Sequence, residues 1–269
     1  MMTVSIVVYH TPEDELRACL RSLSSSVVDR IYIVDNGQEE RLHRLVKEIN
    51  EDIEYIPAPN NGYGAGHNIA IRRALDSGSD FHLVLNSDVY FKPELLESLL
   101  DEMKKNPEVG LIHPRLTYPD GQLQPTARLL PTPWDVFGRR FLPRRLFARR
   151  NDRYTLKGLD LSRAHNVAYV QGSFMLMRVE ALRNVGLFDE RFFMYPEDID
   201  LTRRLHKHYK TLYWPMLSAI HAHRAASYHN MRMLRIHIVN MIRYFNKWGW
   251  LCDQERRIYN NRILEEELR

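Results

Sequence analysis

Short β-branched runs alternate with helical patterns through the first hundred residues of this 269-residue chain. Runs rich in valine, isoleucine and aromatic residues predict strands at 4–9, 31–35, 53–57 and 81–85. Between them, apolar residues at helical spacing predict a helix that opens at 12–15 and further helices at 39–50, 65–77 and 93–105. This order is typical of βαβ units, so we expect an α/β fold with a mainly parallel sheet flanked by helices.

The length allows either one large α/β domain or one domain with a small appendage, and the 44% of residues that are hydrophobic are enough for a core. Cys19 and Cys252 lie far apart and outside any metal-ligand spacing, which argues against a disulfide framework or a zinc site. No signal-peptide pattern opens the chain, and no run approaches about 18 apolar residues. We expect a cytoplasmic protein, or one peripheral on the inner face of the cytoplasmic membrane.

The regular alternation of strand and helix patterns is lost after Pro107. Several prolines and Gly121 punctuate 114–160, which we interpret as long loops for acceptor or membrane contacts. Regular patterns then predict a strand at 167–172, helices at 179–185 and 197–208, a strand at 211–214, and helices in the tail at 229–269. Seven arginines crowd one stretch of the irregular region: Arg139, Arg140, Arg144, Arg145, Arg149, Arg150 and Arg153. This stretch is either a membrane-surface contact or a solvated loop.

A glycine-rich motif at 60–68 follows a predicted strand and precedes a predicted helix. Its alternate glycines, Gly62, Gly64 and Gly66, would let the backbone approach a ligand, and a helix N-terminus favours anions. A flexible turn without a ligand fits this motif equally well. The spacing differs from the dinucleotide-binding fingerprint, so no nicotinamide site is predicted.

Two single acids follow apolar strands. Asp35 opens Asp-Asn-Gly, which on local pattern is more readily a turn than a ligand site. Asp88 ends a run that reads as a buried strand, so its carboxylate needs a partner, and a divalent cation that bridges to phosphate oxygens is a good one. The alternative for Asp88 is a helix cap or a loop acid. His221 follows another apolar run and could join Asp88 as a ligand.

A third acidic cluster, Glu197, Asp198 and Asp200, follows Pro196 and falls in the first turn of a predicted helix. The helix dipole favours acids there whatever their function, and Asp200 can pair with Arg203 or Arg204. Capping alone would explain the cluster. However, the aromatic and charged loop at 188–195 suits a wall that faces a sugar substrate.

Taken in order, these motifs resemble the family 2 inverting glycosyltransferases of GT-A fold, especially their rhamnosyltransferase-like branch, over roughly residues 3–250. The matching segments are 5–9, 34–37, 61–68, 85–89, 171–175, 188–190 and 197–201, followed by His221 and Ser227. The resemblance implies a GT-A domain at 1–228, with a nucleotide-binding half at 1–115 and an acceptor and catalytic half at 116–228, and a helical extension at 229–269.

The resemblance also implies roles for individual residues. Asp198 would be the catalytic base with Glu197 in support, and Asp88 and His221 would hold Mn²⁺ or Mg²⁺ on the donor diphosphate. The implied donor-binding residues are Asp35, Asn36, Asn61, Gly62, Gly64, Gly66, Asn68, Asn86, Ser87, Gly172 and Ser173. The chain departs from the family pattern at Asn86, which replaces the first acid of an Asp-x-Asp motif, and after His221, where glycines are missing and His223 is a rival ligand.

The expected partners are a nucleoside-diphosphate sugar, a glycan or lipid-linked glycan acceptor, and an anionic membrane surface at Arg139–Arg153, but no nucleic acid. The expected reaction transfers rhamnose or a related hexose to a hydroxyl in bacterial cell-surface polysaccharide synthesis. Two other classes compete with this reading. One is an inactive sugar-nucleotide or glycan-binding module, which the retained acids Glu197 and Asp198 oppose. The other is a sugar nucleotidyltransferase, which would carry a glycine-rich basic loop where this chain has residues 9–13.

Overall fold

The computed structural model describes the whole chain except residues 26, 139–143, 223–230 and 268–269. The first part contains β1 (Met2–Val8), α1 (Glu13–Ser22), β2 (Arg30–Asp35), α2 (Glu40–Ile49), β3 (Glu54–Pro57), α3 (Tyr63–Asp76), β4 (Phe81–Asn86), β5 (Val89–Tyr90) and α4 (Glu94–Lys105). The remainder contains β6 (Val109–Thr117), β7 (Ala127–Arg128), the π-helix η1 (Trp134–Gly138), α6 (Arg144–Tyr154), β8 (His165–Asn166), β9 (Tyr169–Val170), β10 (Phe174–Arg178), α7 (Val179–Val185), α8 (Glu197–His206), β11 (Lys210–His221), α9 (Met231–Trp248) and α10 (Gln254–Glu267).

The main sheet has the strand order β3-β2-β1-β4-β10-β6-β11-β5, with β8 beside β11. β3, β2, β1 and β4 pair in parallel, and so do β6 and β11. β10 runs antiparallel between β4 and β6, so its first residues lie where β4 ends. This mixed, mostly parallel sheet confirms the expected α/β class, and it gathers the carboxyl ends of the first four strands at one edge.

Side chains that alternate along the central strands divide the core between the two faces of the sheet. On β4, Leu83 and Leu85 join the cluster formed with α1, α2 and α4. Val84 points to the other face and joins the cluster formed with α3, α7 and α8. This alternation follows from the two-residue repeat of a strand. The acids of α8 are therefore carried by a helix packed directly on the sheet.

The second half of the chain differs most from the expectations. The loops expected at 114–160 are wrong in part, because Arg144–Tyr154 forms α6, and arginine is a good helix former. The strand expected at 167–172 is only the two-residue β9, and the strand expected at 211–214 extends to Lys210–His221. The central strand β10 had not been predicted.

The C-terminal helices dock on α8 through buried ion pairs. Two guanidinium nitrogens of Arg203 donate to the two carboxylate oxygens of Asp253, each at 2.7 Å, and both side chains are nearly inaccessible. The carboxylate of Asp200 accepts from Arg204 at 2.9 Å, which is one of the two pairings that the sequence predicted. It also lies 2.6 Å from the amine of Lys247 on α9. The division at 228 stays a prediction, but strong contacts join the predicted extension to α8.

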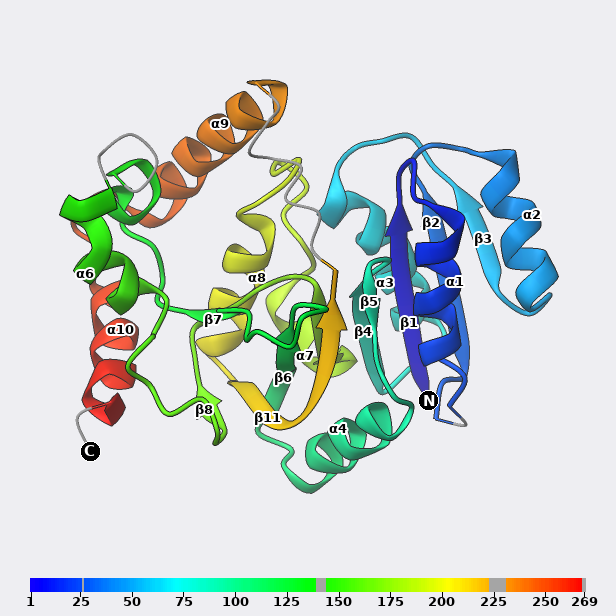
Figure 1. The fold of residues 1–269 in the computed structure, drawn as a ribbon, viewed down its shortest axis with the longest axis horizontal. Coiled ribbons are helices and arrows are strands. Elements are labelled where there is room, and N and C mark those ends of the chain that lie inside the picture. The colour runs from blue at the N-terminus through cyan, green and yellow to red at the C-terminus, as the bar shows by residue number, and fades with distance from the viewer. Residues whose placement is uncertain (26, 139–143, 223–230, 268–269) are drawn as a thin grey trace.

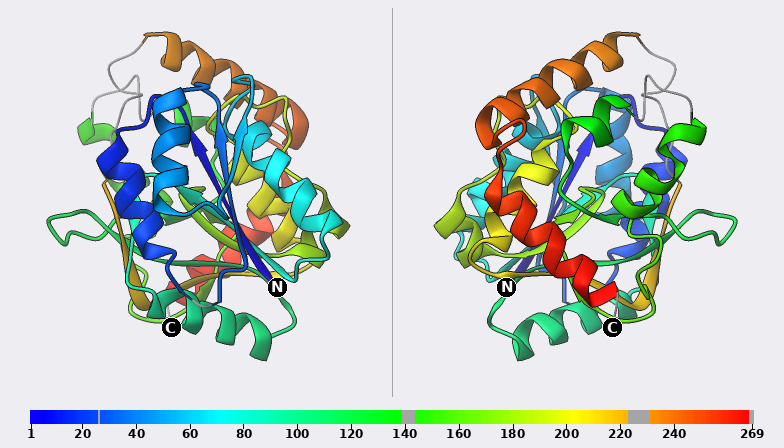
Figure 2. Two further views of the ribbon diagram at one scale, coloured as in Figure 1. Left: turned by 90° about the vertical axis from the view of Figure 1, so that its right-hand side faces the viewer. Right: turned by 90° about the vertical axis from the view of Figure 1, so that its left-hand side faces the viewer.

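Figure 1 shows α6, α9 and α10 together on the side of the molecule away from β1, β2 and β3. In both views of Figure 2, α9 lies along the rim of the molecule. Among the described residues, the helices are too short or too polar to traverse a bilayer.

Candidate active site

Residues from distant parts of the chain meet at the carboxyl edge of β1, β2 and β4. Asp35 pairs in register with Val8, and Asn86 pairs with Val7, so both follow the central strand to the same edge. The backbone N–H of Asn86 donates to the Ser173 carbonyl at 2.9 Å. The sheet topology thus places Asn86 beside Ser173, with Asp35 at the same edge but two strands away from β4.

The glycine motif packs against the loop that precedes α8. Gly62 has φ +105°, and a Cβ there would lie 2.1 Å from the carbonyl oxygen of Phe193, so only glycine fits. A Cβ on Gly64 would lie 2.8 Å from Cβ of Phe188, and one on Gly66 would lie 2.9 Å from a methyl group of Val7. Close packing therefore accounts for all three glycines, and their contact with a donor stays a prediction.

Asp35 is fully buried and holds the loop that follows β2. Its carboxylate accepts from the backbone N–H groups of Gly37 and Glu39, each at 2.7 Å, and from the hydroxyl of Tyr55. This geometry matches the turn favoured by the local sequence. A carboxylate has about four lone-pair sites, so a base contact is compatible with these bonds and remains a prediction. Asn36 beside it is 7% exposed.

Three other predicted donor residues have different surroundings. Asn68 is buried and exchanges hydrogen bonds with the backbone of Phe188, at 2.9 and 3.0 Å, so its side chain fixes the loop beside α8. The Ser87 hydroxyl donates to Glu15 at 2.9 Å. Asn61 is exposed at the start of the glycine motif.

Asp198 is held rigidly at the start of α8. Its two carboxylate oxygens accept from the backbone N–H groups of Ile199 at 2.7 Å and Gly172 at 2.9 Å. The side chain is 7% exposed, and burial raises the pKa of Asp198 to about 6, although the two amides and Arg128 oppose that rise. A carboxylate with a pKa near neutrality, pinned in one orientation, is suited to accept a proton.

Glu197 and Ser173 bring unsatisfied polar atoms to the same place. Glu197 is 4% exposed, and within the described residues its Oε2 has no hydrogen-bond partner. Burial, and then the charge of Asp198, raises the pKa of Glu197 well above its ordinary value. The buried Ser173 hydroxyl likewise has no partner in the described part of the chain. Buried polar atoms of this kind are normally bonded, so a polar ligand such as a sugar would satisfy them.

Asp88 and His221 lie side by side because β5 pairs with the end of β11. Oδ1 of Asp88 is 3.2 Å from Nε2 of His221, and the backbone N–H of Ala222 donates to the Asp88 carbonyl at 2.9 Å. The His221 side chain is 1% exposed and that of Asp88 is 15% exposed. The structure therefore brings the two predicted metal ligands together. The rival ligand His223 and the motif residue Ser227 lie outside the described residues.

This pair fits a divalent cation with an incomplete protein shell. Neighbouring ligands of an octahedral ion, each about 2.1 Å away, are about 3.0 Å apart, close to the observed 3.2 Å. Within the described ranges, no group of three or more histidine, cysteine and acidic side chains gathers as a metal cage. One carboxylate and one imidazole, completed by diphosphate oxygens, would form the shell that the sequence predicts, and this metal role stays a prediction.

Sequence reasoning missed three polar residues of the site. The Tyr63 hydroxyl bridges Asn86 at 2.9 Å and the Gly172 carbonyl at 2.8 Å, and its place inside the glycine motif was the available signal. Gln124 contacts His221, and Arg128 lowers the pKa of Asp198 by its charge. Both follow Gly121 in a segment whose prolines suggested only irregular loops.

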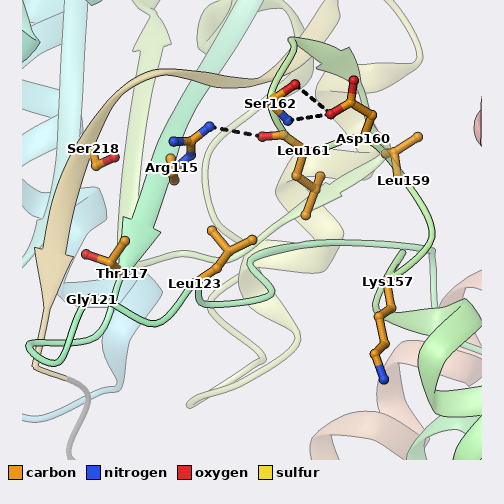
Figure 3. A pocket seen from close by; sticks show the side chains of 10 residues that line it. All are labelled: Arg115, Thr117, Gly121, Leu123, Lys157, Leu159, Asp160, Leu161, Ser162 and Ser218. Atoms are coloured by element: carbon orange, nitrogen blue, oxygen red, sulfur yellow. Dashed lines mark hydrogen bonds between the residues drawn. The ribbon is translucent and has the colours of Figure 1, made fainter.

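The structure contains a cavity of about 500 Å³ (Figure 3). It opens between the ends of β6 and β11 and the segment 157–162, and its lining residues are Arg115, Thr117, Gly121, Leu123, Lys157, Leu159, Asp160, Leu161, Ser162 and Ser218. Arg115 donates to the Leu161 carbonyl at 3.3 Å, and Ser162 donates to Asp160. None of the predicted site residues lines this cavity. The candidate site is therefore defined by its chemistry at the sheet edge.

The sheet, the buried acid on α8 and the Asp88–His221 pair define a GT-A-like glycosyltransferase. Residues 3–186 match the glycosyl transferase family 2, and the chain belongs to that family. Among known proteins, it is 31% identical to the N-acetylglucosaminyl-diphospho-decaprenol L-rhamnosyltransferase of Mycobacterium tuberculosis over 239 residues, which cover 82% of this chain and 76% of that protein. It is also 25% identical to the rhamnosyltransferase WbbL of Escherichia coli, over 97% and 96% of the two chains.

Solved structures support the fold. The chain resembles residues 1–349 of S. aureus TarS with a TM-score of 0.54 and 15% identity, covering 83% of this chain and 58% of that one. It resembles GalNAc-T7, solved with UDP, GalNAc and Mn²⁺, with a TM-score of 0.60 and 13% identity, over 82% and 43% of the two chains. The chain thus spans less than two thirds of each of these structures. They show the fold, whereas the family match and the rhamnosyltransferase relatives support a glycosyltransferase that acts in glycan synthesis.

Proposed function

We propose that the protein is an inverting glycosyltransferase that moves rhamnose or a related hexose from a nucleoside-diphosphate donor to a hydroxyl of a glycan. The observation that carries this proposal is Asp198, a buried carboxylate fixed by the backbone N–H groups of Gly172 and Ile199 at the sheet edge. The rhamnosyltransferase relatives support the sugar class. The name of the mycobacterial relative supports a lipid-linked acceptor in cell-surface polysaccharide synthesis.

In the proposed reaction, Asp198 accepts the proton of the acceptor hydroxyl as its oxygen forms a bond to the anomeric carbon. The bond from that carbon to the donor phosphate oxygen breaks, and the nucleoside diphosphate leaves with the bonding electrons. Attack from the face opposite the leaving group inverts the configuration. General-base action typically contributes about 10²–10⁴-fold, so alignment of the two substrates must supply much of the acceleration.

Asp88 and His221 would hold the divalent cation, and their separation suits the pair for this role. A bound Mn²⁺ or Mg²⁺ would compensate the negative charge that develops on the leaving diphosphate. Tyr63 ties Gly172, beside the base, to Asn86, two residues before Asp88, and so keeps the two parts of the site in register. Ser173 and Glu197 supply polar atoms for sugar hydroxyls.

The experiment that tests this proposal has two steps. A panel of nucleoside-diphosphate sugars is first screened by thermal shift with Mn²⁺ or Mg²⁺, because a bound ligand raises stability. The stabilising donor is then incubated with glycan and lipid-linked acceptors, and the product anomer is assigned by NMR. A product with retained configuration would contradict the inverting mechanism. Stabilisation by donors without transfer to any acceptor would instead favour a binding module.

We also propose that the side carrying α6 and α9 faces an anionic membrane. The α6 arginines Arg145, Arg149 and Arg153 are exposed, whereas Arg150 is bound to Asp135 at 2.6 Å. No residue of α9 before Asn240 is buried, although that stretch is rich in methionine, isoleucine and leucine, and the helix contains no acid. A basic helix with half-exposed apolar residues is typical of elements that lie on a bilayer surface. Arg139 and Arg140 lie outside the described residues.

Vesicle binding tests the membrane proposal. Each arginine near an anionic surface contributes about 1 kcal/mol, so changing Arg145, Arg149 and Arg153 to Ser should weaken binding roughly 100-fold. The control replaces three exposed basic residues on other helices, Arg44, Lys104 and Lys105, and should change binding far less. Equal binding by parent and α6 variant to vesicles with anionic lipid would refute the proposal.

A further inference from the structure

Gln124 is a buried amide in the segment between β6 and β7, with 3% of its surface exposed. Its side-chain N–H groups point at backbone carbonyls, at 2.7 Å from the His221 oxygen and 3.4 Å from the Thr117 oxygen. Its own backbone N–H donates to the Leu116 carbonyl at 2.9 Å, which fixes the segment on β6. The orientation of the amide is therefore set by acceptors that only its nitrogen can satisfy.

This orientation determines the state of the His221 ring. The remaining atom, Oε1 of Gln124, lies 2.9 Å from Nδ1 of His221. A carbonyl oxygen can only accept, so Nδ1 carries the hydrogen. In the neutral ring the other nitrogen, Nε2, then bears a lone pair, and it lies 3.2 Å from Oδ1 of Asp88. A nitrogen and an oxygen at this separation can bind one cation as adjacent ligands.

We propose that Gln124 is a positioning residue that fixes the tautomer and orientation of His221 so that Nε2 is available as a metal ligand. The inference rests on the metal role given to Asp88 and His221 in the proposed function. Histidines that bind metals usually donate their other ring hydrogen to a carbonyl or carboxylate, which orients the ring. Gln124 contacts both the ring and the backbone of His221, so the side chain and the strand end are held by one residue.

A purely structural clamp would have different consequences. If Gln124 only joined β11 to the β6–β7 segment, its removal would lower the free energy of unfolding and leave the ring nitrogens and metal affinity unchanged. A positioning role predicts a loss of metal affinity in folded protein. Loss of such a supporting contact typically costs about 10–100-fold in metal affinity.

The test compares the parent with Gln124→Met, and with Gln122→Met as a matched control. Gln122 lies two residues away and is exposed. Inorganic pyrophosphate is the probe, because it reproduces the diphosphate group of a nucleoside diphosphate. It is titrated into the full chain by calorimetry with and without Mn²⁺. We expect the affinity gained from Mn²⁺ to fall about 10–100-fold in Gln124→Met and to stay at the parental value in Gln122→Met.

Nitrogen NMR of the metal-free parent, labelled at histidine, reads the tautomer directly and requires no variant. We expect His221 to be protonated at Nδ1. Protonation at Nε2 alone would overturn the inference, and so would a parental Mn²⁺ gain in folded Gln124→Met. If the parent gains no affinity from Mn²⁺, the metal role in the proposed function is wrong, and the inference fails with it. If Mn²⁺ raises the affinity of the parent and of Gln124→Met equally, the inference about Gln124 is wrong but the metal role in the proposed function stands.

Discussion

Asp198 and Glu197 allow one chemical change to be compared at adjacent residues. Asp198→Asn and Glu197→Gln each replace a carboxyl group by an amide of nearly the same shape. Asp198 is the proposed base, whereas Glu197 is proposed only to support it, and burial and then the charge of Asp198 raise the pKa of Glu197. Turnover should therefore fall by roughly 10²–10⁴-fold in Asp198→Asn. In Glu197→Gln, which keeps a polar side chain of nearly the same shape, turnover should stay within about tenfold of the parent.

Folding should respond in a different way. The pKa of Asp198 is about 6 in the folded chain against an ordinary value of 3.8, so between these values the folded state binds more protons. Stability therefore falls as pH rises through this window, by on the order of 3 kcal/mol, and Asp198→Asn removes this penalty. The new amide, however, places its own N–H group opposite the backbone N–H of Ile199 or Gly172, and one hydrogen bond is lost. This loss lowers the free energy of unfolding by about 1–3 kcal/mol. The two effects offset near neutral pH.

The assay measures initial rates of transfer across pH at varied acceptor concentration, with donor and metal saturating, and denaturant unfolding of each variant is measured in the same buffers. In the parent, kcat/KM should rise with pH through about 6 as Asp198 ionises, and this rise should disappear in Asp198→Asn. Near-parental turnover in a folded Asp198→Asn variant would refute Asp198 as the base. A loss of about 10²-fold or more in Glu197→Gln alone would instead identify Glu197 as the reacting carboxyl group.

Three further changes test other parts of the site. Arg203→Met leaves the buried Asp253 with Arg256, 3.8 Å away, as its remaining described cation, and should lower the free energy of unfolding by about 3–5 kcal/mol in denaturant titrations; a loss below about 1 kcal/mol would show that the Arg203–Asp253 pair is dispensable. Gly62→Ala places a Cβ 2.1 Å from the Phe193 carbonyl oxygen, so calorimetry should show at least about tenfold weaker nucleotide binding, and parental affinity would contradict the packing argument. Asp88→Ala should keep its fold by circular dichroism but lose the metal dependence of nucleotide binding, and an unchanged dependence would exclude Asp88 as a ligand.

The sequence predicted the first half of the fold closely because the evidence there is local. The mostly buried strands β1, β2 and β4, the more exposed β3 and amphipathic helices alternate from β1 to α4. The boundaries of the predicted elements differ from the observed ones by about two residues or less, although the short strand β5 was not predicted. β10 was missed because Phe174–Arg178 follows another apolar run closely and adds an antiparallel strand between β4 and β6. The position of β10 depends on its pairing with β4, about 90 positions earlier, and with β6, about 65 positions earlier. No local sequence pattern encodes such pairing.

The sequence predicted which acids lie at the site, but it could not predict which of them is a base and which forms a structural ion pair. An acid in the first turn of a helix is expected for capping alone, so the sequence could not separate Asp198 from Asp200. The structure separates them by their partners. Asp200 is neutralised by Arg204 and Lys247, whereas Asp198 accepts from the backbone N–H of Gly172, a residue that begins the approach to β10. A structural ion pair needs a cation within reach, while a base needs a fixed carboxylate that can still gain a proton. Only Asp198 meets the second requirement, because its two hydrogen bonds fix its orientation and burial raises its pKa to about 6.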